Sequence, residues 1–181
     1  MSLMTEDPTI INLSAKPTKS QANFNRRIRK ERGNRCEICG ATTDQKPIEA
    51  HHILDRRAFP QFAKNPENII VACQPCHSGL TDCIGDLEGQ YLIPYGSLPL
   101  SIRKRVAIFI EQNAPNLTTL IQTLRRGRGY AKAVFWWRME HKSLYPPETV
   151  IREYEKEDAA YEKWLASQGS NGQRAKLLPH I

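Results

Sequence analysis

Two C-x2-C pairs account for four of the five cysteines in this 181-residue chain. Cys36 and Cys39 form the first pair, and Cys73 and Cys76 form the second. Each spacing lets both sulfurs reach one ion, so together the pairs can supply the four thiolates of a closed tetrahedral zinc site. We therefore expect these four residues to bind a structural Zn²⁺. Cys83, the fifth cysteine, is expected to be a small buried hydrophobe rather than a ligand.

Two other chemistries are compatible with these cysteines. A disulfide framework would need an oxidising compartment, and residues 1–30 contain no apolar stretch of the kind that a secretory signal needs. Cys73-x2-Cys76-His77 also matches the attachment motif of c-type haem, which would make the protein an electron carrier. That interpretation leaves Cys36 and Cys39 without a role, so zinc is favoured.

Three of the five histidines fall in or beside the segment that the cysteine pairs enclose. His51 and His52 are adjacent, His77 directly follows the second pair, and Asn68 lies between them. Imidazole can ligate a metal or act as a general base near neutral pH, so this set is a candidate active site. Because adjacent residues of a regular strand point to opposite faces, His51 and His52 can converge only where a strand ends or bends.

The order of these motifs resembles the HNH nucleases of the ββα-metal, or His-Me finger, group. The resemblance covers about residues 29–82, less than a third of the chain. The elements that carry it are Cys36-x2-Cys39, Glu49-Ala50-His51-His52-Ile53, Pro66-Glu67-Asn68-Ile69-Ile70 and Cys73-x2-Cys76-His77.

The resemblance implies a role for each polar residue of the motif. His52 would be the general base that deprotonates water, His51 and His77 would hold one divalent metal, and Asn68 would fix the loop and orient the base. The expected activity is that of a metal-dependent endonuclease, which hydrolyses phosphodiester bonds in double-stranded DNA and leaves 5′-phosphate and 3′-hydroxyl ends. The alternative is a non-catalytic zinc-knuckle module that binds DNA or a protein.

The sequence departs from the family pattern in two places. Many members carry a further histidine where this chain has Thr81, followed by Asp82 as a weak third candidate. A metal with two protein ligands, completed by water and phosphate oxygens, is more typical of Mg²⁺ than of zinc. Arg56 and Arg57 replace a glycine-rich turn. They are candidates for contact with the scissile phosphate, or else exposed loop charges.

Positive charge is concentrated in the chain, whose formal net charge is +7. Residues 101–145 hold nine basic and only two acidic residues. Clustered cations attract polyanions, although a solvated helix face gives the same pattern. The predicted DNA contacts in this region are Arg125, Arg126, Arg128 and Lys132. A second cluster comprises Arg26, Arg27, Arg29, Lys30, Arg32 and Arg35.

The pattern of apolar residues, glycines and prolines predicts an α+β fold with a mostly helical C-terminal region. The resemblance implies that the part before this region is a zinc-stapled ββα-metal finger. Strands are expected near 48–53 and 69–72, with a short helix from about residue 75. Longer helices are expected over 21–32, 100–112, 116–124, 130–141 and 147–167, and a connector over 91–99. The predicted parts are a flexible arm (1–20), the finger with its leading basic helix (21–90) and the helical region (91–181).

Aromatic residues of the helical region are expected to pack inside it. Phe135 and the tryptophans at 136 and 137 fit a helical core better than a DNA contact. The last helix is too acidic for a phosphate surface. It is expected to pack through Val150, Ile151, Tyr154, Tyr161, Trp164 and Leu165.

The sequence also bears on location and assembly. No apolar run approaches the roughly 18 residues that span a bilayer, which argues against a membrane protein. We expect an intracellular, cytoplasmic protein that is not secreted. A homodimer is one way to break both strands of DNA, because one finger cuts one strand.

Overall fold

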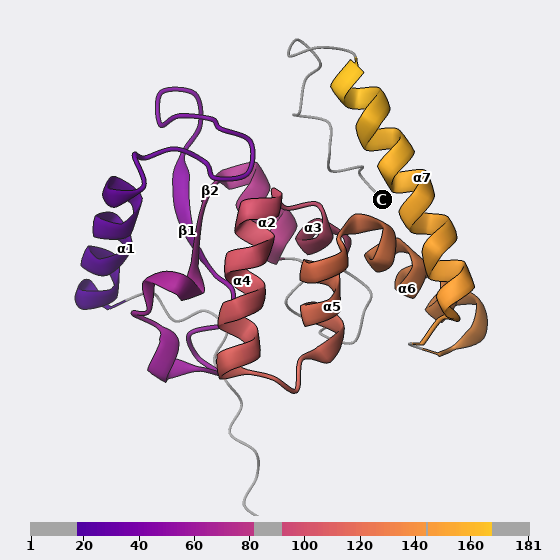
Figure 1. Ribbon diagram of the computed structural model, residues 1–181. Helices are drawn as coiled ribbons and strands as arrows, with labels where there is room; N and C mark the ends of the chain where they lie inside the picture. The colour runs from indigo at the N-terminus through magenta and orange to yellow at the C-terminus, as the bar shows by residue number, and fades with distance from the viewer. Residues whose placement is uncertain (1–17, 82–91, 144, 168–181) are drawn as a thin grey trace, which may run out of the picture.

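The computed structural model describes residues 18–81, 92–143 and 145–167, and within them the chain adopts the predicted α+β fold (Figure 1). A two-stranded antiparallel sheet is followed by a series of helices. The elements are α1 (Lys19–Glu31), β1 (Ile48–His52), η1 (Pro60–Phe62), η2 (Pro66–Asn68), β2 (Ile69–Cys73), α2 (Gln74–Thr81), α3 (Ile93–Gly96), α4 (Leu100–Asn113), α5 (Thr118–Arg126), α6 (Arg128–His141) and α7 (Glu148–Ser167).

The register of the sheet decides which side chains share a face. His51 pairs with Ile70, and His52 pairs with Ile69. Partners across an antiparallel ladder point to the same side, and successive residues alternate between sides. His52 therefore shares its face with Ile69 and Val71, whereas His51 shares the other face with Glu49 and Ile70. The strand does not end before His52, so the two histidines point to opposite faces.

Helix α1 covers the face that carries His52. Phe24 and Ile28, four residues apart, are buried against Ile48, Ile69 and neighbouring apolar residues of the sheet. The helix begins where the Thr18 hydroxyl accepts a hydrogen bond from the Gln21 N–H (3.2 Å). It ends before Gly33 and Asn34, which both have positive φ, as the Gly-Asn pair predicts.

The opposite face of the sheet packs on the C-terminal helices. Ile70 and Leu80 belong to one apolar core with Ile102, Phe109 and Leu124, among others from α3 to α6. In Figure 1, α2 lies between the sheet and the helical region. The predicted boundary between residues 90 and 91 lies outside the described residues, as do Asp82 and Cys83.

Glu37 joins three parts of the fold. Its carboxylate accepts hydrogen bonds from the Val71 N–H of β2 (2.6 Å), from Arg32 after α1 (2.9 Å) and from Arg105 of α4 (3.0 Å). A half-buried carboxylate with three donors, two of them charged, fixes α4 and α1 against the same strand.

The predicted connector over 91–99 contains a short helix. The four residues of α3 begin at Ile93 with Pro94 in the first turn, where a missing N–H costs nothing. Helix α3 touches α2, α5 and α6. A Cβ on Gly96 would lie 2.8 Å from the carbonyl carbon of Gly127 and 2.9 Å from the Arg128 Cα, so the two backbones approach more closely than any side chain allows.

Helix α7 approaches the backbone of α6 closely at Gly129, and Arg128 of α6 lies over the Tyr161 ring of α7 at 5.6 Å. A Cβ on Gly129 would lie 2.7 Å from the Glu155 Cα, and Ala131 and Ala133 are fully buried. The prediction of a tryptophan-filled core is therefore wrong for Trp136 and Trp164, which are 48% and 55% exposed. Ile151 is buried as predicted, whereas Tyr161 is exposed and the Leu165 side chain lies outside the described atoms. No helix of the described segments combines the length and apolarity that crossing a bilayer requires.

Candidate metal centre and histidine cluster

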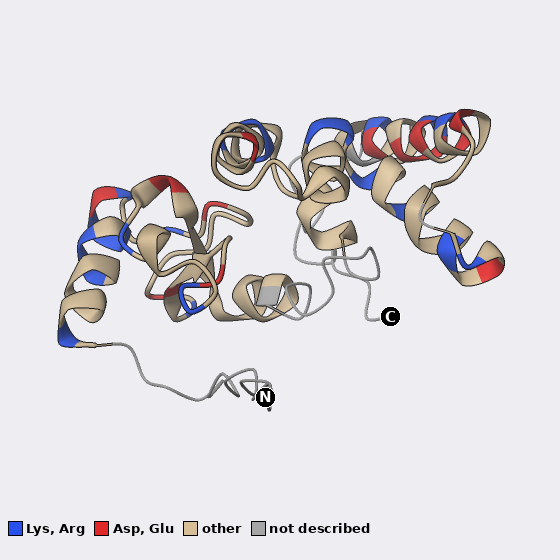
Figure 2. Cartoon of the chain, turned by 90° about the horizontal axis from the view of Figure 1, so that it is seen from below, with Lys and Arg blue, Asp and Glu red and all other residues tan. Residues whose placement is uncertain are grey.

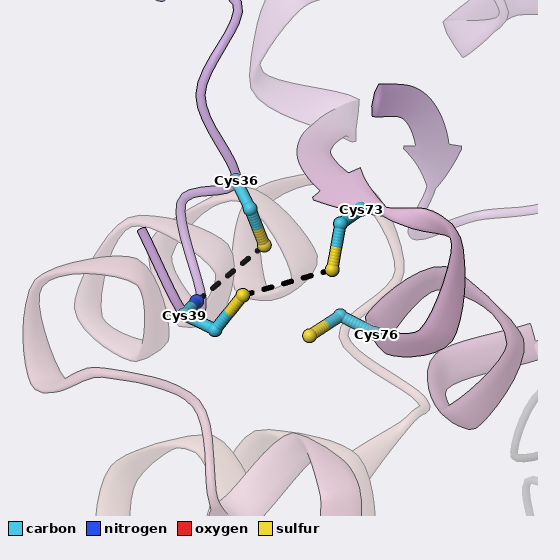
Figure 3. Close-up of side chains that lie close together, drawn as sticks. All are labelled: Cys36, Cys39, Cys73 and Cys76. Atoms are coloured by element: carbon cyan, nitrogen blue, oxygen red, sulfur yellow. Dashed lines mark hydrogen bonds between the residues drawn. The ribbon is translucent and has the colours of Figure 1, made fainter. Parts of the chain in front are cut away.

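The four cysteines of the two C-x2-C pairs converge on one point (Figure 3). Their sulfur atoms all lie within 4.8 Å of one another, and those of Cys39 and Cys73 are 3.6 Å apart. Cys36 and Cys39 lie on a tight turn closed by the Gly40 N–H to Cys36 carbonyl bond (2.9 Å), with Gly40 at φ +78°. Cys73 ends β2 and Cys76 lies in the first turn of α2.

This cluster fits a tetrahedral metal ion such as zinc. All four cysteines are free thiols rather than disulfides, which argues against the disulfide interpretation. The convergence of both pairs also gives Cys36 and Cys39 the role that the haem interpretation left out. Among the described residues, this is the only group of three or more Cys, His, Asp or Glu side chains with ligand atoms in mutual reach.

Because the four sulfurs lie close together, pKa values of thiols in the cluster are shifted in different directions. Hydrogen bonds, chiefly from Cys76, lower the pKa of Cys36 to about 4. The pKa of Cys76 is raised, first by its hydrogen bond to Cys36 and then by burial, and burial raises the pKa of Cys39. Several adjacent thiolates repel one another without a counter-charge, which a divalent ion supplies. The donor set therefore suits a cation.

A second cluster forms where β1 meets α2 and α3. The rings of His51 and His77 stand edge to face with centroids 5.2 Å apart. Two imidazoles that share one ion, each with a nitrogen about 2.1 Å from it, have centroids roughly 4.5–5.5 Å apart. The spacing of His51 and His77 therefore fits two ligands of one divalent ion.

Each ring of this pair has a hydrogen-bond partner. His77 Nδ1 lies 3.0 Å from the Glu49 carboxylate, and His51 Nε2 lies 3.0 Å from the hydroxyl oxygen of Tyr95. A carboxylate accepts, so His77 carries its proton on Nδ1 and presents the Nε2 lone pair. Burial, followed by the neighbouring His77 and His52, lowers the pKa of His51 to about 3 and keeps that ring neutral at pH 7.

His52 lies apart from this pair, on the α1 face of the sheet. Its Nε2 is 3.1 Å from the carbonyl oxygen of Ala63, which can only accept, and 3.3 Å from the side-chain nitrogen of Gln21, whose two hydrogens are directed to other acceptors. Nε2 is therefore the protonated nitrogen and Nδ1 has the lone pair. The Gln21 amide donates to the same carbonyl (2.9 Å) and to Asn25. Burial lowers the pKa of His52 despite this carbonyl, so the ring is neutral at pH 7.

Asn68 holds the loop that carries Ala63. Its side chain is fully buried, accepts from the Leu54 N–H (2.8 Å) and donates to the carbonyls of Leu54 (3.0 Å) and Phe62 (3.1 Å). All the main hydrogen-bonding positions of this amide are used to close residues 54–68. Asn68 contacts the backbone of the loop rather than any of the three imidazoles.

The structure thus brings together two of the three predicted imidazoles. His51 and His77 share a site, while His52 points to the opposite face because β1 continues through it. The Thr81 side chain and Asp82 lie outside the described atoms. Sequence reasoning missed Glu49 as a partner of His77 although it quoted the residue, and it had no signal for Tyr95 or for the Ala63 carbonyl.

The predicted DNA-contacting arginines have different surroundings. Arg56 and Arg57 are half-buried in the turn after His52, and the charge of Arg56 contributes to the lowered pKa of His52. In the helical region every predicted cation faces an acidic side chain. The pairs are Arg125 with Glu111 (2.6 Å), Arg126 with Glu148 (2.8 Å) and Glu155 (2.7 Å), and Arg128 (3.9 Å) and Lys132 (3.6 Å) with Asp158. These ion pairs count against the prediction that the four residues bind DNA.

Comparison with known proteins bears on the same segment. No curated protein and no solved structure significantly matches the chain. Residues 36–82 match the family model described as HNH endonuclease, and this range contains both cysteine pairs, all three imidazoles and Asn68. Over residues 36–82, the chain therefore carries a domain of the HNH endonuclease family.

Proposed function

We propose that this protein is a metal-dependent endonuclease that hydrolyses phosphodiester bonds in double-stranded DNA. The observation that supports it most is the pairing of His51 and His77 at 5.2 Å beside a four-thiolate cluster, within a segment that matches a nuclease family. A structural Zn²⁺ would occupy the four thiolates. Mg²⁺ or another divalent ion would bind at the two imidazoles and stabilise negative charge on the leaving oxygen.

His52 is the proposed general base. Its neutral ring carries a lone pair on Nδ1 because Nε2 donates to the Ala63 carbonyl, and Asn68 fixes the loop that presents this carbonyl. Nδ1 can therefore take the proton of the attacking water. In an in-line displacement, the attacking and leaving oxygens lie on opposite sides of phosphorus. Histidines on opposite faces of β1 suit a phosphodiester that crosses the end of that strand.

The DNA surface is proposed to include α1, which lies on the same face as His52. Arg26, Arg27 and Lys30 are exposed there, and Lys64 of the adjoining loop is also exposed. Phosphate contacts from such cations supply sequence-independent affinity. The described residues give no support for a homodimer. Whether one strand or both are cut is read from the ratio of nicked to linear product.

A cleavage assay tests the proposal. Zinc-loaded protein and supercoiled plasmid should give nicked or linear DNA with Mg²⁺ or Mn²⁺, and none with EDTA. His52→Ala should reduce the rate at least a hundredfold, since a general base contributes about 10²–10⁴-fold, while DNA binding is unchanged. His141→Ala on the exposed side of α6 is the matched control and should cut normally.

The alternative is a non-catalytic module, and the separation of His52 from the other two imidazoles favours it. In that case the wild-type protein would bind the plasmid but leave it intact under every divalent ion. Retention of full cleavage by His52→Ala would refute the role of His52 as base but not the nuclease activity.

A further inference from the structure

A residue of the helical region reaches the histidine pair. Tyr95 of α3 lies outside the segment that matches the HNH family, yet its hydroxyl oxygen is 3.0 Å from Nε2 of His51. Both side chains are almost completely buried, with 3% of Tyr95 and 2% of His51 exposed. Bulk water therefore does not compete for this hydrogen bond, and its direction determines which nitrogen of the neutral ring carries the proton.

The two directions have opposite consequences for metal binding. If the Tyr95 hydroxyl donated, Nε2 would hold the lone pair and Nδ1 would carry the proton. If Nε2–H donates to the tyrosine oxygen, the Nδ1 lone pair is available. Nδ1 has no hydrogen-bond partner in the described part of the chain, and the partner ring, His77, is likewise held by an acceptor, Glu49. A ring that ligates through one nitrogen usually donates its other N–H to such a partner.

We propose that Tyr95 is a positioning residue of the divalent-ion site, whose hydroxyl oxygen accepts the Nε2–H of His51 and keeps the Nδ1 lone pair of that ring for the ion. This inference rests on the part of the proposed function that assigns an ion to His51 and His77. It gives the C-terminal helices a direct share in the nuclease site, through one side chain.

Helix α3, which carries Tyr95, packs on α5 and α6 of the helical region as well as on α2 of the HNH segment. Gly96, the neighbour of Tyr95, packs backbone to backbone against Gly127 and Arg128 at the start of α6. The hydroxyl group is therefore carried on a short helix clamped from behind, which limits how far it can follow a displaced His51 ring. Such support holds a ligand in one orientation and one tautomer.

The first test is the tautomer of His51 in the zinc-loaded 181-residue protein without added divalent ion. Long-range ¹H–¹⁵N NMR spectra should show Nε2 protonated and Nδ1 bare. A spectrum with Nδ1 protonated would overturn the proposal, and this measurement depends on no variant.

The second test compares Tyr95→Phe with wild type in Mn²⁺ binding, measured by calorimetry in the absence of DNA. The variant loses only the hydroxyl oxygen, and we expect Mn²⁺ affinity to fall about 10–100-fold. Zinc content and the thermal midpoint should stay close to those of wild type. Tyr130→Phe, which removes a half-buried hydroxyl from α6, is the matched control and should bind Mn²⁺ normally.

Cleavage kinetics separate this proposal from the proposed function. In Tyr95→Phe the Mn²⁺ concentration for half-maximal rate should rise with the loss of affinity, while the rate at saturating Mn²⁺ recovers. Equal Mn²⁺ affinity in variant and wild type would overturn the role of Tyr95, even if both cut DNA. Weaker Mn²⁺ binding by the variant, together with no cutting by wild type, would support that role and refute the nuclease. A wild type that binds no Mn²⁺ would overturn both.

Discussion

The two cationic clusters of this protein have different neighbours. On α1, Arg26 and Lys30 are exposed and have no acidic partner within the described residues, and only Arg27 makes an exposed ion pair, with Glu31 (3.5 Å). On α5 and α6, the acidic helix α7 and Glu111 of α4 neutralise the cations. Figure 2 shows basic residues along α1, whereas basic and acidic residues alternate along α7.

The comparison shows that a run of basic residues in a sequence does not by itself indicate a surface that binds DNA. Arg126 binds two carboxylates, which raise the pKa of its guanidinium above its usual value, and it lies over the Tyr130 ring at 5.2 Å. Such a side chain, at the end of α5, stabilises the packing of α5 on α7. The exposed cations of α1, by contrast, are available to a phosphate backbone.

The largest effect is expected from a change in the four-cysteine cluster, which stabilises the sheet on which α1 packs. Cys73→Ser takes one thiolate from the cluster, and zinc binding contributes about 10–16 kcal/mol to the folding of small metal-stabilised domains. We expect loss of bound zinc, rapid hydrogen exchange throughout β1 and β2, and no DNA binding by α1. Amides of α6 should keep much of their protection, because they pack on α7. Cys83→Ser is the control and should retain about one zinc per chain, since Cys83 belongs to neither C-x2-C pair.

The second change acts on the paired cluster. Arg126→Ala removes the partner of Glu148 and Glu155, and we expect the free energy of unfolding to fall by about 1–3 kcal/mol in denaturant titrations. Arg152→Ala is matched to it, because Arg152 contacts the same Glu148 (3.6 Å) from a 70% exposed position. That control should change the free energy by less than about 0.5 kcal/mol. Equal effects of the two variants would contradict a structural role for Arg126.

The third and smallest effect is expected on DNA affinity, when two positive charges are removed from either cationic cluster. Arg26→Gln with Lys30→Gln should weaken binding of a short duplex roughly tenfold and reduce the salt dependence of the association constant by about two ions. Arg125→Gln with Lys132→Gln removes the same charge from the paired cluster and should leave the salt dependence unchanged. Fluorescence anisotropy over a range of salt concentrations measures both. If instead Arg125→Gln with Lys132→Gln reduced the salt dependence, the cations of α5 and α6 would be the ones that contact DNA.

Much of the fold followed from local sequence signals. Helix α1 ends shortly before Gly33-Asn34, and α7 begins directly after Pro147. The strands carry the expected apolar residues. The four-cysteine cluster was predictable because the spacing within each pair restricts the possible geometry. Helix α3 was missed because a four-residue helix that contains Pro94 and Gly96 has the composition of a loop.

The partners of individual side chains were beyond the sequence. Arg126 and Glu155 are twenty-nine residues apart, and His51 and Tyr95 are forty-four apart, so no periodicity links them. The exposure of Trp136 was predicted wrongly because the buried positions of α6 are taken by Gly129, Ala131, Ala133 and Val134, which leaves Trp136 on the exposed side of the helix. The sequence did raise the opposite-face conflict of His51 and His52, and only the register of β1 with β2 could decide it.

The core that Ile70 and Leu80 share with Ile102 and Phe109 has a consequence for any attempt to transplant the HNH segment into another protein. A fragment that ended after α2 would expose the apolar side chains on one face of its sheet to water, and we expect it to aggregate. A chimeric protein would therefore have to include the C-terminal helices that cover this face of the sheet.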